Sequence, residues 1–599
     1  MKLSDYVIDF VVRQGVKHLF MLPGGGAMHL NESLGQRRAD IEFVCNLHEQ
    51  AVGIAAEAYV KVTNGLGVAM VTTGPGGTNA VTGVAGAWLD SMPCLFISGQ
   101  VKRADLKLQT GLRQLGSQEV DIVSIVESIT KYAVTIIDPK SIRFHLEKAV
   151  YLAKSGRPGP VWIDIPMDVQ AADIDVENLL GFVPDKKDAP DANKLKEQVR
   201  EVLAMLGAAQ RPVIVAGNGI RVAGAIPEFL TAVEAMGAPV LTTWLAMDLL
   251  WESHPLFAGR PGSIAPRGAN FALQNSDLMV VIGSRLDMAF TGYAHDRLAR
   301  AAKKVMVDID PAEIAKMKTQ IHLPVVADVG DFLRELLRQL KAASLPDFHQ
   351  WQQRCRDWKE RYPVVQDLHR KWSDRVSVYY LSEVLSDELR GDDVFVSGSS
   401  GSAVELFLLA FKVKEGQRIF HTRGLGAMGF GLPASIGACL AAGRRRTICV
   451  DGDGGFQMNI QELETVRRLK LPIKFFVVNN EGYASIRISQ QNYFKHLVAA
   501  DEASGLTLPD LMKVATAYGV QTVRIEDQAD LHKKIRSVLE MPGPVVCEVM
   551  SPPEEQRAPR LSSMQRTDGT MVSKPLEDLW PFLDREEFRA NMIIPPIED

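Results

Sequence analysis

Residues 447–456 read Thr447-Ile448-Cys449-Val450-Asp451-Gly452-Asp453-Gly454-Gly455-Phe456, an apolar run that enters a glycine-rich turn. A helical pattern follows at 459–469, then a second apolar run at 473–478, and the pair Asn479-Asn480 closes the segment. This order is typical of a β-α-β unit, in which parallel strands bring their carboxyl ends to one edge of a sheet. We therefore expect Asp453 and Asn480 to meet at such an edge.

The chemistry of the turn suits a diphosphate that is held through a divalent cation. Glycines at 452, 454 and 455 let backbone N–H groups approach an anion, and a helix N-terminus adds partial positive charge. One carboxylate, one amide oxygen and one backbone carbonyl, completed by phosphate oxygens and water, give the octahedral oxygen shell that Mg²⁺ prefers. A Gly-Asp-Gly turn alone is a common turn, so the signal lies in the whole constellation.

Outward from this unit, the chain divides into three α/β blocks joined by polar stretches at 184–190 and 342–374, the second with some helix. Short apolar runs alternate with helical patterns in each block, which predicts three doubly wound parallel sheets. The expected domains are 1–180, 190–342 and 375–552, followed by a wrapping tail at 553–599. The expected strands are 18–21, 41–47, 67–73, 94–98 and 161–165, then 212–216, 239–242, 278–282 and 304–308, then 394–397, 447–450, 473–478 and 545–549.

The composition of the 599 residues excludes several classes of protein. Lys and Arg number 67 against 72 Asp and Glu, for a net charge of −5, which predicts neither a nucleic-acid footprint nor binding to an anionic membrane. No apolar run is long enough to span a bilayer, and the start of the chain lacks a signal pattern. The six cysteines form no C-x-x-C pair, which indicates reduced thiols. We expect a cytoplasmic protein.

Glu49 is the candidate acid for proton transfer, in Asn46-Leu47-His48-Glu49-Gln50-Ala51. It follows the expected strand 41–47 and opens a helical pattern, which places its carboxyl at a strand end where α/β sites form. Burial there would raise its pKa and let it share a proton. The alternative is that Glu49 only caps the helix through its negative charge. His48 is expected to be structural or a minor contact.

These motifs together resemble the signature of thiamine-diphosphate enzymes. The resemblance implies that Asp453, Asn480 and the carbonyl of Gly482 bind Mg²⁺. It implies that Glu49 hydrogen-bonds the aminopyrimidine ring across a subunit boundary, so the active unit is at least a dimer. Met428, in Gly424-Leu425-Gly426-Ala427-Met428-Gly429, matches the apolar wedge that holds the cofactor bent, although by itself it would be a core methionine. The implied cofactor contacts of this region are Gly426, Met428, Gly452, Gly454, Gly455, Tyr483 and Ile486.

Nearly the whole chain is similar to the acetolactate synthase family, the large subunits of acetohydroxyacid synthase. The similarity is carried by Leu22-Pro23-Gly24-Gly25-Gly26, Thr73-Gly74-Pro75-Gly76-Gly77-Thr78-Asn79 and Arg157-Pro158-Gly159-Pro160. It implies pyrimidine-binding, central and diphosphate-binding domains. Gln118 matches an active-site glutamine that could orient a 2-oxo acid, and the alternative is a surface glutamine. The implied cofactor contacts of the first block are Pro23, Gly24, Gly25, Thr73, Gly76 and Asn79.

The middle block bears on FAD. Gly217-Asn218-Gly219 follows a strand but lacks the full G-x-G-x-x-G pattern, so the spacing alone is a weak signal. By resemblance, acetolactate synthases hold a structural FAD in this block, and residues 260–272 and 283–287 are similar to segments around it. The residues implied to lie near the flavin nucleotide are Arg157, Gly217, Gly219, Asp310 and Asp328.

Several positions depart from acetolactate synthase. Ser117 stands where the family has Phe, Ser402-Ala403-Val404 replaces Gln-His-Gln, and Ser489 falls at the family's substrate-selecting tryptophan. Smaller side chains predict a roomier pocket for a larger, hydroxylated acceptor. Residues 480–491 resemble the sub-branch found with surface-polysaccharide biosynthesis, whose members transfer an acetyl unit from pyruvate to a nucleotide-activated keto sugar. Arg487 there could contact a carboxylate or phosphate, or be a charged helix residue.

The expected function is decarboxylation of a 2-oxo acid such as pyruvate, with carbon–carbon bond formation to an acceptor carbonyl that could belong to a keto sugar. The alternatives are an acetolactate synthase that condenses two pyruvates, a simple decarboxylase, and a cofactor-binding protein without turnover. The presence of Glu49, Asp453 and Asn480 argues against the last. The implied assembly is a homodimer or homotetramer with its active site at a subunit interface.

Overall fold

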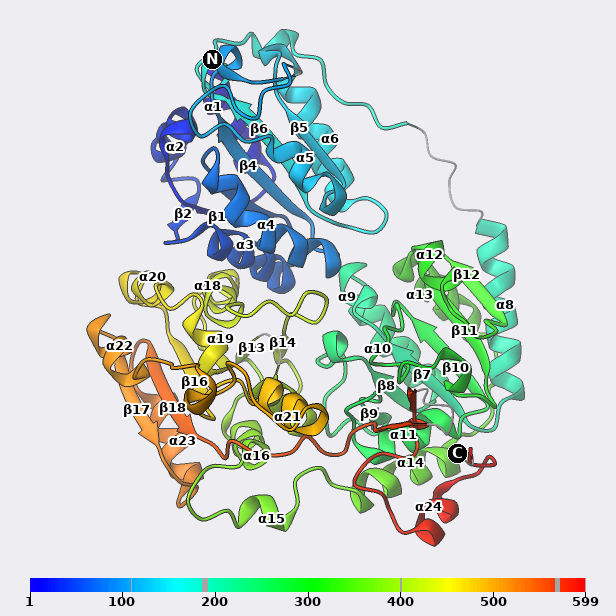
Figure 1. The fold of residues 1–599 in the computed structure, drawn as a ribbon. Helices are drawn as coiled ribbons and strands as arrows, with labels where there is room; N and C mark the ends of the chain where they lie inside the picture. Colours follow the sequence, from blue (N-terminus) through cyan, green and yellow to red (C-terminus); the bar gives the residue numbers. More distant parts are fainter. Residues whose placement is uncertain (109, 186–191, 399–400, 566–570, 598–599) are drawn as a thin grey trace.

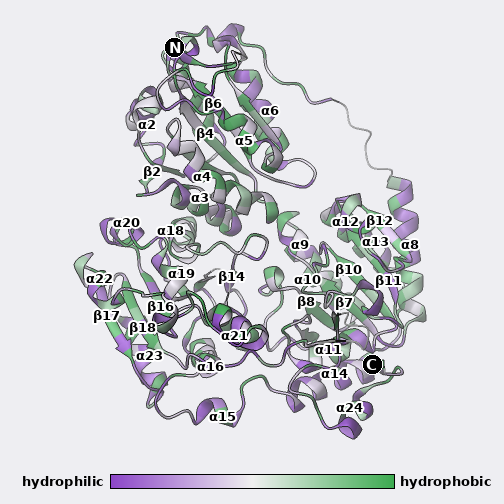
Figure 2. Ribbon diagram, in the orientation of Figure 1, coloured by the Kyte–Doolittle hydropathy of each residue, from purple (hydrophilic) through white to green (hydrophobic). Residues whose placement is uncertain are grey.

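The computed structural model describes residues 1–108, 110–185, 192–398, 401–565 and 571–597. These residues form three six-stranded parallel sheets, each flanked by helices, as the sequence predicts (Figure 1). Hydrophobic residues concentrate in the strands and hydrophilic ones on outer helices such as α8 (Ala192–Ala208) (Figure 2). Part of the connector at 184–190 lies outside the described residues.

The first sheet has the strand order β2-β1-β3-β4-β6-β5. Its central strands are buried along their whole length, because helices cover both faces. The strands are β1 (His18–Met21), β2 (Glu42–Cys45), β3 (Gly67–Val71), β4 (Cys94–Gln100), β5 (Tyr132–Thr135) and β6 (Val161–Pro166). The helices are α1 (Leu3–Arg13), α2 (Met28–Gln36), α3 (Glu49–Thr63), α4 (Pro75–Leu89), α5 (Ile122–Val126), α6 (Ile142–Lys154) and α7 (Met167–Gln170).

The third sheet repeats this topology, with the order β14-β13-β15-β16-β18-β17. Numbered from the first strand of each sheet, both orders read 2-1-3-4-6-5, so the first and third domains share one plan. The strands are β13 (Val394–Ser397), β14 (Arg418–Phe420), β15 (Thr447–Gly452), β16 (Ile473–Asn479), β17 (Gln521–Ile525) and β18 (Val545–Met550). The helices are α16 (Val378–Glu388), α17 (Ser402–Ala410), α18 (Gly431–Ala441), α19 (Asp453–Gln457), α20 (Glu462–Arg468), α21 (Ala484–Tyr493), α22 (Leu511–Ala517) and α23 (Leu531–Glu540).

The central sheet has the order β12-β11-β10-β7-β8-β9, which reads 3-2-1-4-5-6 from the other end. This is the strand order of dinucleotide-binding sheets, with a switch between its first and fourth strands. The strands are β7 (Pro212–Ala216), β8 (Val240–Thr242), β9 (Phe257–Gly259), β10 (Leu278–Ile282), β11 (Lys303–Asp308) and β12 (Leu323–Val326). The helices besides α8 are α9 (Gly219–Val222), α10 (Ile226–Met236), α11 (Arg267–Gln274), α12 (Pro311–Ala315), α13 (Val329–Leu340), α14 (His349–Arg361) and α15 (Asp367–Arg370).

The stretch 342–374, expected as a connector, contributes α14 to the body of the central domain. Trp351 and Trp358 of this helix are buried in the same apolar cluster as Phe271. The two tryptophans are seven residues apart, so they lie on one face of the helix, which explains why it packs rather than extends.

The first and third domains are joined through α3, which packs on α18. Their apolar residues form one cluster that includes Val52 and Ile436. At this interface Lys61 is buried and pairs with Glu57 (2.8 Å) and Asp90 (2.6 Å). The pairing is needed because a buried ammonium group without a partner would be strongly unfavourable.

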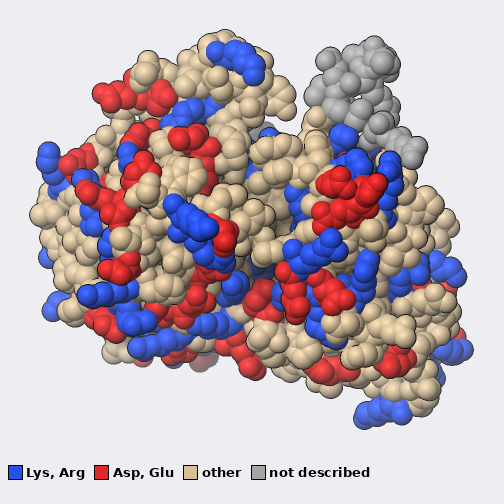
Figure 3. Space-filling view, turned by 90° about the horizontal axis from the view of Figure 1, so that it is seen from below, with Lys and Arg blue, Asp and Glu red and all other residues tan. Residues whose placement is uncertain are grey.

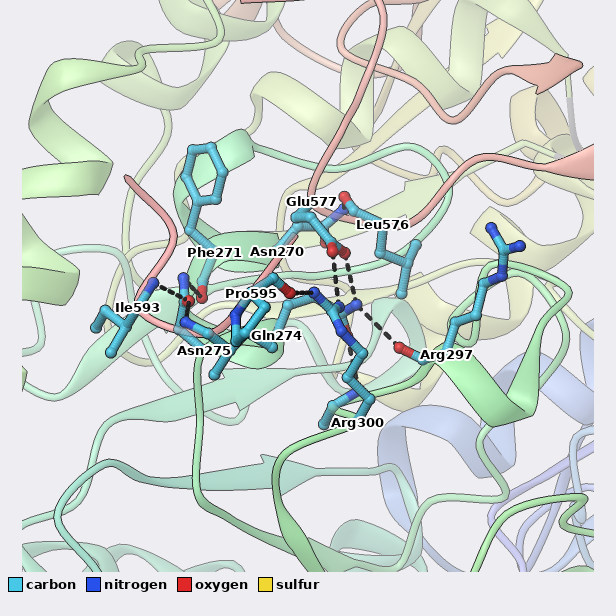
Figure 4. Close-up of polar contacts among 12 residues, drawn as sticks. Asn270, Phe271, Gln274, Asn275, Arg297, Arg300, Leu576, Glu577, Ile593 and Pro595 are labelled. Atoms are coloured by element: carbon cyan, nitrogen blue, oxygen red, sulfur yellow. Dashed lines mark hydrogen bonds and ion pairs between the residues drawn. The ribbon is translucent and has the colours of Figure 1, made fainter. Parts of the chain in front are cut away.

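The C-terminal tail crosses from the third domain to the central domain and ends with α24 (Arg585–Asn591) (Figure 1). Glu577 is buried, and it binds Arg300 Nη1 (2.7 Å) and Gln274 Nε2 (2.7 Å) (Figure 4). Asn275 of the central domain accepts a hydrogen bond from the backbone N–H of Ile593 (2.7 Å). These contacts make the tail part of the central domain's surface.

We expect Glu577→Ala to destabilise the protein by about 3–5 kcal/mol, because the substitution leaves the Arg300 guanidinium without its anion. Thermal unfolding would show a lower midpoint, and limited proteolysis would cut the tail. The matched control is Glu586→Ala, which removes an exposed carboxyl of α24. Equal midpoints for the two variants would contradict the role of Glu577.

Charged groups of both signs are intermingled over the face drawn in Figure 3. No helix in the described ranges has the length and apolarity that crossing a membrane requires. The six cysteines Cys45, Cys94, Cys355, Cys439, Cys449 and Cys547 are all free thiols, as the sequence predicts.

Candidate active site

The residues predicted from the first block gather at the carboxyl edge of its sheet. Pro23, Gly24 and Gly25 follow β1, whereas Thr73 follows β3 and Gly76 and Asn79 lie at the start of α4. Because β1 and β3 are neighbours on either side of the chain reversal, their loops frame the place where doubly wound sheets bind ligands. Asn79 donates a hydrogen bond to Glu49 Oε2 (3.0 Å), which ties the start of α3 to this group. We call Glu49 and these six residues the Glu49 cluster.

Capping does not account for the buried carboxyl of Glu49, which is 8% exposed. His48 Nδ1 accepts a hydrogen bond from the N–H of Gln50 (3.1 Å). Glu462, from the third domain, accepts one from the N–H of Leu47 (2.7 Å). The His48 side chain thus caps the start of α3, a structural role among those expected for it, and Glu49 also lies in the first turn of this helix.

Gln118 reaches the Glu49 cluster through a backbone conformation that is rare for residues other than glycine. Its φ of 66° lies in the left-handed region, and its carbonyl accepts a hydrogen bond from the Thr73 hydroxyl (3.3 Å). Its side chain is exposed. Such backbone strain persists where neighbouring contacts hold it, often at functional sites.

A buried chain of hydrogen bonds supports Gln118 from below. The single proton of the Thr73 hydroxyl is shared between the Gln118 carbonyl and the nearer Gln100 Oε1 (2.9 Å), and Gln100 Nε2 donates to Asp164 Oδ2 (3.1 Å). Ser98 also donates to Asp164 (2.6 Å). Burial raises the pKa of Asp164 to about 7 despite these hydrogen bonds.

We expect Gln100→Leu to lower stability by about 1–3 kcal/mol, because Thr73 and Asp164 each lose a buried partner. Release of Thr73 would also loosen Gln118, so the KM of a substrate bound beside Gln118 is expected to rise. Thermal unfolding and steady-state kinetics check the two effects. Gln36→Leu, at an exposed position of α2, is the control. A variant with normal KM would separate Gln100 from the site.

Asp453 and the turn at 480–482 meet at the carboxyl edge of the third sheet, as the motif predicts. β15 and β16 pair in parallel with Gly452 opposite Val478. Asp453 Oδ2 accepts a hydrogen bond from the N–H of Gly482 (3.1 Å), and Oδ1 accepts one from Gly454 (2.8 Å). This edge also flanks a chain reversal, here between β13 and β15.

The oxygen atoms at this edge fit a divalent cation. Asn480 Oδ1 is buried and has no hydrogen-bond partner among the described residues, and burial raises the pKa of Asp453 to about 6. A bound cation would satisfy the amide oxygen and favour the ionised carboxylate. The Gly482 carbonyl accepts one hydrogen bond, from Ala484 (3.2 Å), which leaves a second lone pair. Within the described ranges, no cluster of three or more His, Cys, Asp and Glu side chains could hold a metal. The candidate ligands at this edge are instead of three kinds: a carboxylate, an amide oxygen and a backbone carbonyl.

The prediction of a single helix over 459–469 is wrong at its N-terminal end. α19 begins at Asp453, directly after the turn, and α20 follows as a separate helix. The break lies near Asn459, whose Nδ2 donates to the Gly429 carbonyl (2.7 Å). That bond brings the loop with Gly426 and the half-buried Met428 beside the end of α19.

The start of α21 completes this edge. The ring of Tyr483 lies where a side chain at Gly454 would be, so the glycine is required for close packing. Arg487 donates to the carbonyls of Asn480 (2.8 Å) and Pro553 (3.0 Å), so its guanidinium fastens the turn to the tail. This contact differs from the carboxylate or phosphate contact considered from the sequence. Ile486 is exposed.

The two clusters lie apart within one chain. Figure 1 shows α18 between α3 and α19. Among the described residues, no hydrogen bond or ion pair joins Glu49 to Asp453, and the partner of the Glu49 carboxyl is Asn79. We call the Glu49 cluster and the edge at Asp453 the two half-sites.

A cavity of about 370 Å³ lies at the switch point of the central sheet, within the roughly 300–1,000 Å³ range of ligand pockets. We call it the switch-point cavity. All three domains line it, through residues such as Arg157, Asn218 and Arg423. Asn218 Oδ1 is buried and has no hydrogen-bond partner in the described chain, so a polar ligand fits this wall.

The residues predicted near FAD divide into two groups. Arg157, Gly219 and Asp328 line the switch-point cavity. Gly217 lies behind its wall, where a side chain would overlap the carbonyl of Gly283. Asp310 pairs with Arg157 (3.0 Å) at the border between the first and central domains.

Two residues of the switch-point cavity escaped the sequence analysis. Trp244 and Arg423 line it together, with the Arg423 guanidinium over the indole ring at 5.0 Å. They come from different domains and carry no shared motif, so the sequence offers no signal for their pairing.

A wide cavity of about 770 Å³ adjoins α21 and the tail, and we call it the α21 cavity. Seven of its eleven lining residues carry a carboxylate or an amide, including Gln491, Glu502 and Glu554. Ser489 is exposed on the same helix, and Ser117 is exposed beside Gln118. The side chains of Ser402 and Ala403 lie outside the described residues.

Comparison with known proteins agrees with this architecture. Three models of thiamine pyrophosphate enzymes match the chain: the N-terminal TPP binding domain at residues 1–125, the central domain at 199–336 and the C-terminal TPP binding domain at 398–549. Together with the edge at Asp453, they define a thiamine-diphosphate-dependent enzyme.

The relatives narrow the class. The acetolactate synthase large subunit of Cyanidium caldarium is 33% identical over 93% of this chain and 94% of its own length. The acetolactate synthase isozyme 1 large subunit of Escherichia coli is 32% identical over 93% and 95%, and acetolactate synthase 2 of Zea mays is 32% identical over 94% and 87%. The chain belongs to the acetolactate synthase family.

Proposed function

We propose that this chain decarboxylates pyruvate and joins the remaining two-carbon unit to the carbonyl carbon of a second substrate. The observation that carries the proposal is the edge where Asp453 lies beside the unpartnered amide oxygen of Asn480. The relatives are acetolactate synthases, a name that describes a condensation of this kind.

In this proposal, Asp453, Asn480 and the Gly482 carbonyl hold Mg²⁺, and the cation fixes the diphosphate. Thiamine diphosphate, when bound, supplies the electron sink for the loss of CO₂. Glu49 holds the proton at the aminopyrimidine ring, and Asn79 orients its carboxyl. The amide of Gln118 orients the 2-oxo acid.

We also propose that the half-sites combine between two chains, so that Glu49 of one chain serves the Asp453 edge of its partner. The separation of the clusters within one chain supports this arrangement. The smallest active unit is then a homodimer, and a homotetramer contains two such units. Size-exclusion chromatography with light scattering tests it: a fully active monomer would exclude the shared site.

For the switch-point cavity we propose FAD. The Rossmann-type strand order and the unpartnered Asn218 amide oxygen support a dinucleotide there. Purified protein would then carry a yellow, releasable flavin. A colourless protein with full activity would remove FAD from the proposal.

The acceptor has two candidates. The α21 cavity is large and rich in amides, which favours a polar acceptor such as a keto sugar. Its carboxylates, including Glu481, Asp501 and Glu554, and the engagement of Arg487 with backbone carbonyls disfavour a nucleotide diphosphate at this wall. A second pyruvate is therefore the other candidate, in keeping with the names of the relatives.

One assay separates them. Purified protein with thiamine diphosphate, Mg²⁺ and pyruvate is followed for CO₂ and acetolactate, with and without added keto sugars. Abundant acetolactate from pyruvate alone would identify a second pyruvate as the acceptor. CO₂ release that depends on an added keto sugar would identify the sugar as the acceptor. If no mixture consumed pyruvate, the carboligase proposal would be refuted.

A further inference from the structure

A second cavity, of about 400 Å³, lies between the central and third domains, and its lining includes buried residues such as Arg260 and exposed ones such as Lys412. Its walls are the loop around β9, the last turns of α14 and the end of α17. Arg260 is part of this wall, so we call it the Arg260 cavity. None of the residues proposed to hold thiamine diphosphate or Mg²⁺ lines it, whereas Arg260, Pro266 and Ala269 come from the segment 260–272 that is similar to one around FAD. Residues 261–264 turn the other way and line a small pocket that shares Trp244 and Arg423 with the switch-point cavity.

Positive charge exceeds negative charge around the Arg260 cavity. Five of its lining residues are Lys or Arg and three are Glu. Glu383 binds Arg370 through both carboxylate oxygens (2.8 and 2.9 Å) and also lies 3.3 Å from Lys412. Glu252 pairs with Lys359 (2.9 Å). Two of the three carboxylates are thus already engaged by other cations of the wall.

Arg260 itself has no carboxylate at ion-pair distance in the described chain. Its side chain is 5% exposed, Nη2 donates to the Phe411 carbonyl (2.5 Å), and Nη1 has no hydrogen-bond partner. Burial lowers the pKa of Arg260, but a guanidinium keeps its proton at neutral pH. The cavity therefore holds a buried cation with an unused donor.

The surroundings of Arg260 are arranged for an oxyanion. A buried charge is strongly unfavourable unless a counter-charge or hydrogen bonds compensate it. The flat guanidinium matches phosphate and carboxylate groups. The Phe257 ring lies against both Arg260 (5.6 Å) and the Lys359 ammonium (4.8 Å), so the two cations flank one apolar wall.

We propose that the Arg260 cavity binds a small phosphorylated molecule whose phosphate accepts a hydrogen bond from Nη1 of Arg260. The excess of two positive charges in the wall matches a phosphate monoester, which carries about two negative charges at neutral pH. Lys359 and Arg356 add positive charge from α14.

The test titrates inorganic phosphate into the enzyme loaded with thiamine diphosphate, Mg²⁺ and FAD, at constant ionic strength with chloride as balance. Calorimetry and the thermal midpoint report binding without need of activity, so failure here is distinct from failure of the proposed function. We expect one saturable site in the unaltered chain. Arg260→Met is expected to weaken it about tenfold or more, since a charged hydrogen bond is lost.

A second cavity variant and a surface control test whether any loss of phosphate binding is specific to the Arg260 cavity. Arg356→Gln, on the rim of the cavity, is expected to weaken phosphate binding less than Arg260→Met, and it carries the test if the buried variant fails to fold. Arg338→Gln removes an exposed guanidinium of α13 that pairs with Glu335, and it is expected to bind phosphate normally. Acetate, titrated in the same way, is expected to bind more weakly than phosphate.

Three results would overturn the proposal. The first is the absence of saturable phosphate binding up to about 10 mM, which would leave the cavity to water. The second is unchanged affinity in a folded Arg260→Met variant. The third is binding of acetate, but not phosphate, with the same dependence on Arg260.

Discussion

Glu49→Gln is expected to lower kcat by about 10²–10⁴-fold, the usual contribution of a positioned general acid–base group. The amide keeps the size of the side chain and can still pair with Asn79, but it cannot share a proton with the aminopyrimidine ring. Binding of thiamine diphosphate should change little, because the diphosphate is held on the other half-site. Steady-state kinetics with pyruvate and calorimetry of cofactor binding measure the two effects separately.

The control for Glu49→Gln is Glu127→Gln, the same chemical change at an exposed position of the first domain. It should leave kcat unaltered. Full activity of the Glu49 variant would refute its role. A loss of cofactor binding equal to the loss of activity would instead assign Glu49 to structure.

Asp453→Ala is expected to abolish turnover by removing the only carboxylate proposed for the Mg²⁺ shell. Loss of a charged ligand costs several kcal/mol, so Mg²⁺-dependent binding of thiamine diphosphate should weaken at least about 100-fold. Titration of cofactor at fixed Mg²⁺, followed by intrinsic tryptophan fluorescence or calorimetry, measures the change. Asn480→Ala should also weaken Mg²⁺-dependent binding of thiamine diphosphate, but by a smaller factor, because it removes a neutral ligand.

Asp527→Ala is the matched control for Asp453→Ala, since Asp527 lies on the surface and pairs with Lys534 (2.7 Å). Chelation of Mg²⁺ should reproduce the Asp453→Ala behaviour in the unaltered enzyme, and added Mg²⁺ should restore it. Cofactor affinity that is the same in Asp453→Ala and Asp527→Ala would remove Asp453 from the metal shell.

Interior strands were predictable from the sequence, and most edge strands were not. The expected strands 212–216 and 278–282 coincide with β7 and β10, because strands buried on both faces read as continuous apolar runs. In the three six-stranded sheets, the five strands without an expectation are β5, β9, β12, β14 and β17, and all lie at sheet edges. In β17, for example, only Ile525 is buried, so its pattern resembles a loop.

The residues of the candidate site also divide into those that the sequence could predict and those that it could not. Asp453 and Asn480 were predictable because one β-α-β unit fixes both. The Glu49 cluster depends on three adjacent strands, β2, β1 and β3; the position of Glu49 at a strand end indicated it, and resemblance to a family added the other six residues. Trp244, Arg423 and Arg260 meet their neighbours across domain borders, where no local spacing gives a signal.

The contacts of the tail have a consequence for synthesis of the chain. Leu576 and Phe588 belong to the same apolar cluster as Phe271 and Trp358 of the central domain. The ribosome makes these two residues only after the whole third domain, so the central domain waits with part of its apolar surface uncovered. Domains of large proteins generally fold as units during synthesis, and uncovered apolar surface promotes aggregation in the meantime. The first domain can fold early, whereas the central domain is completed last, although it precedes the third in the sequence.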